Sequence, residues 1–166
     1  TPEGDIQIAA WFLTHCHSDH ISGFSSFIER YGAQVNVEQL IYNFDTYEHY
    51  EWGKNDSLLG YPGYEFFDII VKLNPQIKIS TCHSGYKYHI RNAVIDIMYT
   101  LEDNFPKVLG VSLSDANNTS TIFKISFTDD NVDQTLLITG DSGTVESAGL
   151  LSKYQGDELK STFVQA

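Results

Sequence analysis

The chain has 166 residues, so we expect a single domain over residues 1–166, because domains commonly span roughly 100 to 200 residues. Hydrophobic residues form 42% and charged residues 19% of the sequence, which excludes intrinsic disorder as its overall state. Ten Lys and Arg against 22 Asp and Glu give a net charge of −12, which argues against a basic nucleic-acid-binding groove. No run approaches the about 18 apolar residues that a membrane span requires.

The N-terminal part of the chain predicts a strand, a turn and a helix. Residues 6–13 are almost entirely apolar, which is typical of a strand buried on both faces. A histidine-rich turn follows. The next apolar residues recur with helical spacing, with Ser22 near the start and Gly32 as a C-cap. These residues are Phe24, Phe27, Ile28 and Tyr31.

The remaining elements alternate between strands and helices. Five further segments have the composition of strands, namely residues 35–43, 77–81, 93–100, 119–128 and 135–139. Residues 66–73 predict a short helix that ends before Asn74-Pro75, and residues 145–151 predict a last helix. The aromatic loop at residues 42–64 lacks periodicity, and an apolar pair at 163–164 lies near the C-terminus.

Four potential metal ligands lie within six residues after the first strand: His15, His17, Asp19 and His20. Neutral imidazole is the commonest metal ligand and Asp adds an anionic oxygen, so this set can divide between two neighbouring cations. The first two histidines share one face in extended geometry, whereas the other two ligands fall on the turn into the helix. The alternative is a surface cluster of polar turn residues.

A second acid, Asp141, follows an apolar strand and Gly140, 121 residues after His20. By itself a Gly-Asp pair predicts a turn. Together with the histidine cluster, it resembles the metallo-β-lactamase fold superfamily of metallohydrolases. Residues 117–125, with their Asn-Asn-Thr-Ser start, are similar to the branch that contains the soluble domain of competence-type DNA-uptake proteins.

The resemblance implies an α/β fold, a four-layer αββα sandwich with two divalent transition metals at one edge. It places His15 and His17 on the first metal, Asp19 and His20 on the second, and Asp141 between them. Zinc is the first choice for this ligand set, and manganese or iron also suit its carboxylates. Cys16 occupies a variable position of the family.

Two departures from the family pattern concern the ends and the ligands. Family members have several strands before the histidine motif and a histidine segment after the last strand, so we expect this chain to be truncated at both ends. Bare strand edges would then favour self-association. The family's intervening histidine has three candidates, His49, His83 and His89, of which His83 best follows a strand.

The ligand set predicts a metal-dependent hydrolase that uses a metal-activated water, with Asp19 orienting the water and accepting its proton. The substrate is expected to be a phosphodiester or another ester, or a small molecule. The family branch favours nucleic acid and the net charge of −12 disfavours it. The alternatives are a noncatalytic metal-binding module or an interaction module that uses the aromatic loop at residues 42–64. The sequence leaves open whether the domain is cytoplasmic or part of a larger membrane protein.

Overall fold

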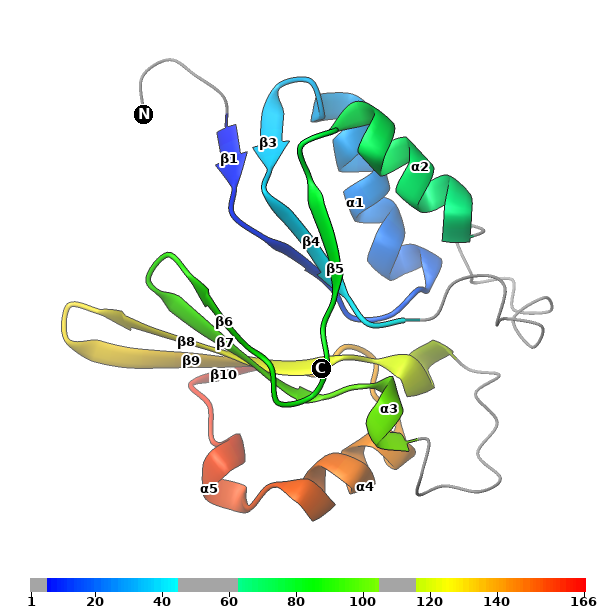
Figure 1. Cartoon of the computed structure of the whole chain (residues 1–166). Coiled ribbons are helices and arrows are strands. Elements are labelled where there is room, and N and C mark those ends of the chain that lie inside the picture. The colour runs from blue at the N-terminus through cyan, green and yellow to red at the C-terminus, as the bar shows by residue number, and fades with distance from the viewer. Residues whose placement is uncertain (1–5, 45–62, 105–115) are drawn as a thin grey trace.

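The computed structural model describes residues 6–44, 63–104 and 116–166. Their strands form two main sheets with helices on both outer faces, which gives the layer order helix, sheet, sheet, helix (Figure 1). The αββα sandwich expected from the sequence is therefore confirmed. No helix in the described ranges is both long and apolar enough to cross a membrane.

The first half of the chain builds a three-stranded sheet, a further pair of strands and the helices that cover them. Its strands are β1 (Ile6–Ile8), β2 (Trp11–Leu13), β3 (Val35–Val37), β4 (Gln39–Tyr42) and β5 (Lys78–Thr81). Its helices are α1 (Ser18–Tyr31) and α2 (Gly63–Leu73). β2, β4 and β5 form a parallel sheet in that order, and β1 pairs with β3. Neighbouring parallel strands need crossover connections, which explains why α1 lies between β2 and β4 in the chain.

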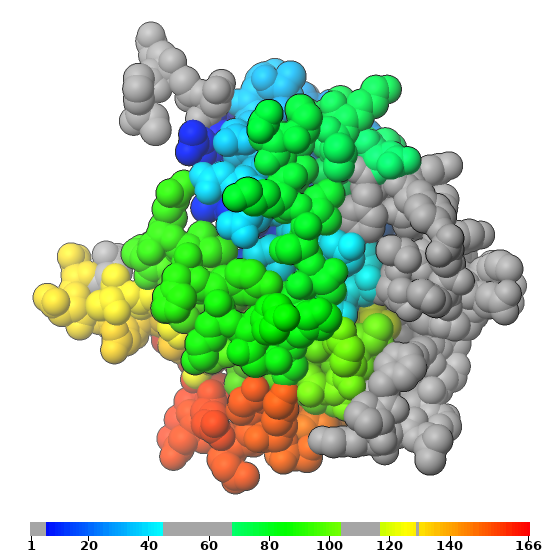
Figure 2. Space-filling model, in the orientation of Figure 1, coloured from blue at the N-terminus to red at the C-terminus, as the bar shows by residue number. Residues whose placement is uncertain are grey.

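The second half of the chain builds a five-stranded sheet in the order β10-β9-β8-β7-β6. Its strands are β6 (Lys87–Ile90), β7 (Ala93–Tyr99), β8 (Ile122–Asp129), β9 (Val132–Ile138) and β10 (Phe163–Gln165). The helices are α3 (Leu101–Asn104), the 3₁₀ helix η3 (Ala116–Thr119), α4 (Thr144–Lys153) and α5 (Gly156–Leu159). The β8–β9 hairpin turns at Asp130-Asn131, whose φ angles are 47° and 63°, and it projects from the body of the domain (Figure 2).

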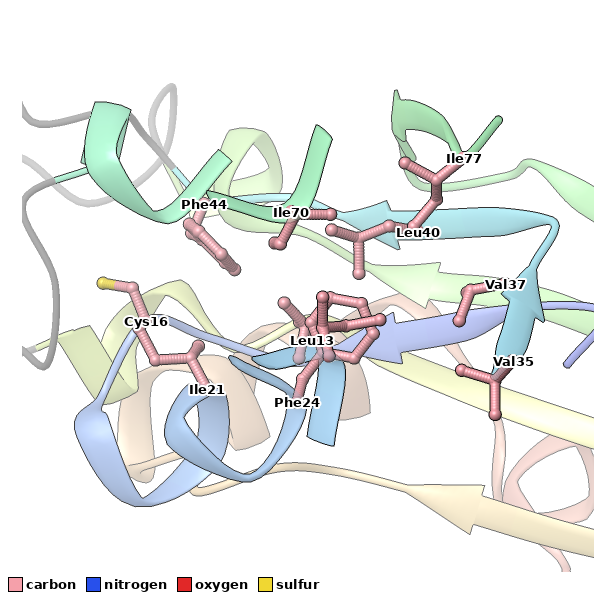
Figure 3. Close-up of a cluster of buried hydrophobic side chains, with 11 residues drawn as sticks. Leu13, Cys16, Ile21, Phe24, Val35, Val37, Leu40, Phe44, Ile70 and Ile77 are labelled. Atoms are coloured by element: carbon pink, nitrogen blue, oxygen red, sulfur yellow. The ribbon is translucent and has the colours of Figure 1, made fainter. Parts of the chain in front are cut away.

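Three apolar clusters fill the three interfaces between these layers. The first joins α1 and α2 to the first sheet, where Phe24 and Ile70 contact a cluster that includes Leu40 (Figure 3). The second lies between the two sheets and consists of Ile41, Cys82, Ile95, Ile97 and Phe123. The third lies between the second sheet and α4 and consists of Met98, Tyr99, Ile122, Leu137 and Leu150. Each layer is therefore held by burial of apolar area, the dominant favourable term in folding.

The prediction of one strand at residues 6–13, buried on both faces, is wrong. The segment forms β1 and β2, which pair with β3 and β4 respectively, and Ile6 is 65% exposed. The apolar run serves two strand pairs, and only Leu13 within it is fully buried. The predicted strand at residues 35–43 likewise divides into β3 and β4.

Other boundaries also shift in ways that matter for the site. α1 begins at Ser18 rather than near Ser22, so Asp19 and His20 lie in its first turn. The predicted strand at residues 119–128 begins at Ile122, because residues 116–119 form η3. The C-cap at Gly32 is confirmed, and its N–H donates to the Ile28 carbonyl at 2.8 Å.

We expect Leu150→Ala to lower the free energy of unfolding by about 2 to 5 kcal/mol, because it removes a buried side chain from the third cluster. Leu151→Ala is the matched control, because this neighbour on the same helix is 65% exposed, and its effect should be near zero. Urea unfolding followed by circular dichroism measures both. Equal losses in the two variants would contradict the placement of α4.

Candidate metal centre

The strand ends of both sheets meet at one edge of the sandwich. Leu13, Tyr42 and Thr81 pair in one row, so β2, β4 and β5 end together. In the second sheet, β7 and β9 end where β8 begins. The Thr121 N–H donates to the Thr14 carbonyl at 2.9 Å and joins the two sheets at this edge. Polar side chains that follow different strands are thereby brought together.

His15 and His17 follow β2 and are both buried, His15 with 0% of its surface exposed. The His15 Nε2 lies 3.2 Å from the His17 Nδ1. On its other side, the His15 Nδ1 lies 3.1 Å from the Thr14 hydroxyl and 3.5 Å from the Ser120 hydroxyl. When Nδ1 carries the proton, it can donate a hydrogen bond to these hydroxyl oxygens. The lone pair of Nε2 then faces His17.

The start of α1 positions the next two candidate ligands. His17 is the N-cap residue, with φ −66° and ψ 147°, and its carbonyl accepts the His20 N–H at 3.0 Å. Asp19 in the first turn is 71% exposed at its side chain and lies near the positive end of the helix dipole. Cys16, between the two histidines, is buried and belongs instead to the first apolar cluster. The two histidines therefore face the polar site, whereas the cysteine between them belongs to the apolar core.

Asp141 reaches the same place from the second sheet. Its Oδ1 lies 3.3 Å from the His20 Nε2, and the Asp19 Oδ2 lies 3.6 Å from that same nitrogen. Ligand atoms of His15, His20 and Asp141 all lie within 4.8 Å of one another. Residues that follow one strand of each sheet and one residue of α1 therefore converge.

The loop before Asp141 depends on close packing at Gly140. This residue has φ 59°, in the left-handed region that favours glycine. A Cβ there would lie 3.0 Å from the Thr14 Cβ and 3.1 Å from the Ser120 Oγ. After the loop, the buried Glu146 accepts the Gly143 N–H at 3.0 Å, at the start of α4. Gly140 and Glu146 therefore hold the two ends of the turn that carries Asp141.

Burial lowers the pKa of His15 to about 4, and the neighbouring His20 and His17 act in the same direction. Asp141 and Asp19 raise it, but by less. His15 is therefore neutral at pH 7, which is the protonation state that a metal ligand requires.

The donor atoms fit a metal ion. Zinc–nitrogen bonds of about 2.0 to 2.1 Å in tetrahedral geometry place neighbouring ligand atoms about 3.3 Å apart. The distance from the His15 Nε2 to the His17 Nδ1 is 3.2 Å, and that from the His20 Nε2 to the Asp141 Oδ1 is 3.3 Å. Both pairs therefore have the spacing of two ligands that share a cation.

The other histidines lie elsewhere. His83, the best candidate for an intervening ligand, is hydrogen-bonded through Nδ1 to Glu102 at 2.9 Å and does not belong to the group within 4.8 Å. His89 lies on the exposed side of β6 and also falls outside the group within 4.8 Å. His49 lies outside the described residues, as does most of the aromatic loop at 42–64.

Sequence reasoning missed the residues that support these ligands. Thr14 and Glu146 belong to no motif that the sequence analysis used, and Ser120 was noted only as part of the pattern at residues 117–125. The contacts of Thr14 with Thr121 and of Ser120 with His15 join residues that are distant in the chain. The exception is Gly140, which the Gly-Asp pair marked as a turn position. Its structural role could have been anticipated from the need of a tight turn for a positive φ.

The sequence model of the metallo-beta-lactamase superfamily matches residues 3–98, more than half of the chain. The chain therefore belongs to this superfamily. None of the curated proteins matches it.

Among solved structures, the chain is similar to two of CmlA, a diiron β-hydroxylase from Streptomyces venezuelae, and to the metallo-β-lactamase fold protein YhfI from Bacillus subtilis. The β-hydroxylase mutant has TM-score 0.46 and 15% identity, with 84% of this chain and 22% of that chain covered. The other CmlA structure has TM-score 0.43 and 17% identity, with 79% and 20% covered. YhfI has TM-score 0.41 and 13% identity, with 80% and 40% covered. The chain thus spans well under half of each of these proteins.

We expect Gly140→Ala to lower the free energy of unfolding by about 1 to 3 kcal/mol, because it adds a Cβ at positive φ against Thr14. It should also weaken zinc binding, since the turn carries Asp141. Gly23→Ala is the matched control: Gly23 is an exposed α1 residue with nothing within 4 Å of an added Cβ, and alanine should stabilise the helix by up to about 1 kcal/mol. Urea unfolding in chelator and calorimetric zinc titration give the two readouts. The account of the turn fails if Gly140→Ala leaves both unchanged.

Proposed function

We propose that the chain carries a binuclear metal centre and hydrolyses ester bonds, with a phosphodiester as the substrate class. The convergence of His15, His20 and Asp141 within 4.8 Å, in a chain of the metallo-beta-lactamase superfamily, is the observation that carries this proposal. In it, His15 and His17 hold the first cation, Asp19 and His20 hold the second, and Asp141 lies between the two.

The distances support this division. His15 and His17 contact each other through ring nitrogens, and His20 lies between the carboxylates of Asp19 and Asp141. Asp141 is near both pairs, because its ligand oxygen lies within 4.8 Å of both the His15 and the His20 nitrogens. A carboxylate at that position can offer one oxygen to each cation.

If divalent cations were bound by these residues, the chemistry that they would supply is Lewis acidity, which would lower the pKa of water at the centre to about 7. The mixed imidazole and carboxylate donor set suits zinc, manganese and iron, and zinc is our first choice. The described chain contributes no cysteine to the group, which leaves the harder metals as candidates beside zinc.

Asp19 is the residue to which we assign the proton transfer. Its carboxylate is 71% exposed and borders the centre through His20, so it can reach both solvent and an attacking water. There it orients the water and accepts its proton, while His15, buried and neutral, binds without releasing one.

The phosphodiester assignment rests on the resemblance of residues 117–125 and 136–141 to the competence-type DNA-uptake branch. Residues 117–119 lie in η3, and Thr121, two residues after η3, donates its N–H to the Thr14 carbonyl, so this segment borders the centre. The net charge of −12 favours a short diester over a long polyanion. A small ester is the remaining alternative within the same chemistry.

Purified protein should contain up to two divalent metals per chain, and His15→Ala and Asp141→Ala should each lose at least half of them. Elemental analysis of protein prepared without chelator measures the content. His89→Ala and Asp157→Ala are the matched controls, because both residues are exposed and lie outside the cluster. Equal metal content in the cluster variants and the controls would contradict the proposed centre.

Asp19→Asn should lower kcat/KM on an activated phosphodiester by about 10² to 10⁴, because the amide cannot accept the proton of water. Asp157→Asn should leave the rate unchanged, since Asp157 is 88% exposed on α5. Release of 4-nitrophenolate gives the rate, and metal analysis of each variant separates lost chemistry from lost metal. A metal-loaded parent without turnover on any ester would support the noncatalytic metal-binding alternative instead.

A further inference from the structure

A second polar cluster, which we call the His83 cluster, lies at the same edge as the candidate metal centre. It consists of Asn43 after β4, His83 after β5 and Glu102 in α3. Its members come from both sheets, since α3 follows β7 of the second sheet. Like the metal centre, it therefore bridges the two sheets where their strands end.

The strand register fixes the separation of the two clusters. β2 and β5 flank β4 and end in the same row, and His15 and His83 each lie two residues beyond that row. Two strand spacings give a backbone separation on the order of 10 Å. A separation of this size is compatible with one substrate that contacts both the candidate metal centre and the His83 cluster.

Asn43 is the buried anchor of this cluster, with only 3% of its surface exposed. Its Nδ2 donates to the Cys82 carbonyl at 2.5 Å and to the two Glu102 carboxylate oxygens at 3.0 and 2.9 Å. Burial raises the pKa of Glu102, but hydrogen bonds from Asn43 and Thr100 outweigh it and lower the pKa below its ordinary value. Glu102 is therefore an anion held in one place.

Glu102 in turn orients His83. Its Oε1 lies 2.9 Å from the His83 Nδ1, and the His83 ring meets the Tyr86 ring edge-on, with centroids 5.3 Å apart. The His83 side chain is 45% exposed, and its Nε2 has no hydrogen-bond partner in the described part of the chain. An imidazole fixed on Nδ1 by a carboxylate, with Nε2 open to solvent, is arranged for proton transfer at Nε2.

We propose that His83 is a general acid that protonates the leaving group of the substrate bound at the metal centre, with Glu102 and Asn43 as positioning residues. The inference rests on the proposed hydrolase function. It deepens that function by specifying the leaving group, which is an alkoxide, because a phenolate with a low pKa needs no proton to depart.

The reaction balances with water alone. The water oxygen forms a bond to phosphorus, and its proton passes to Asp19. The bond from phosphorus to the ester oxygen breaks, and that oxygen takes the proton from the His83 Nε2. The Glu102 carboxylate balances the charge of the protonated ring before transfer, and solvent then restores the proton to His83.

Two phosphodiesters that differ in leaving group test this role. Thymidine 5′-(4-nitrophenyl phosphate) releases a phenolate, and the dinucleotide TpT releases an alkoxide. In the full chain, His83→Gln should lower kcat/KM for TpT by about 10² to 10⁴ and that for the nitrophenyl ester by less than about threefold. Glu102→Gln should shift the ratio of the two rates in the same direction but by less, because the amide still contacts His83 without a charge.

The controls separate this role from folding and from the proposed function. His89→Gln should leave both rates unchanged, and metal content together with circular dichroism checks each variant. Equal losses on both substrates, or no loss on either, would overturn the role of His83 while leaving the hydrolase function in place. A metal-loaded parent that hydrolyses neither diester would overturn the hydrolase function, and the role of His83 with it.

Discussion

The contact between Thr14 and the second sheet is the constraint on which the site depends. Its carbonyl accepts the Thr121 N–H, its hydroxyl lies beside the His15 Nδ1, and its side chain packs where Gly140 leaves room. One threonine therefore fixes the distance between the sheets and the orientation of the first histidine. It also limits how close the turn before Asp141 can approach. A larger side chain at residue 140 would push that turn away from the histidines.

The edge that results carries two polar clusters side by side. Sheet order places the candidate metal ligands after β2 and β9, and the His83 cluster after β4, β5 and β7. Asn43, directly after β4, and Thr121, directly before β8, lie between them in sheet order and join the sheets. Apolar clusters pack the layers on either side of this edge, and burial of their faces holds each layer in place.

The sequence was sufficient for the layers, and it singled out the candidate ligands but not the residues that contact them. His15, His17, Asp19 and His20 were recognisable because four potential ligands within six residues form a local pattern. Hydrophobic periodicity likewise identified α1, α2 and most strands. The apolar run at residues 6–13 led to the wrong prediction of a single strand, because periodicity does not reveal that one run forms two strands with different partners. The sequence did not predict the contact between Asn43 and Glu102, because the two residues lie 59 positions apart and neither belongs to a motif.

Anomalous X-ray diffraction from crystals grown with zinc, recorded on both sides of the zinc absorption edge, tests the binuclear centre most directly. Two anomalous peaks are predicted, one between the His15 Nε2 and the His17 Nδ1, and one beside the His20 Nε2, with the Asp141 carboxylate between them. A crystal with full-occupancy zinc elsewhere on the chain and no peak at these nitrogens would contradict the assignment of the site.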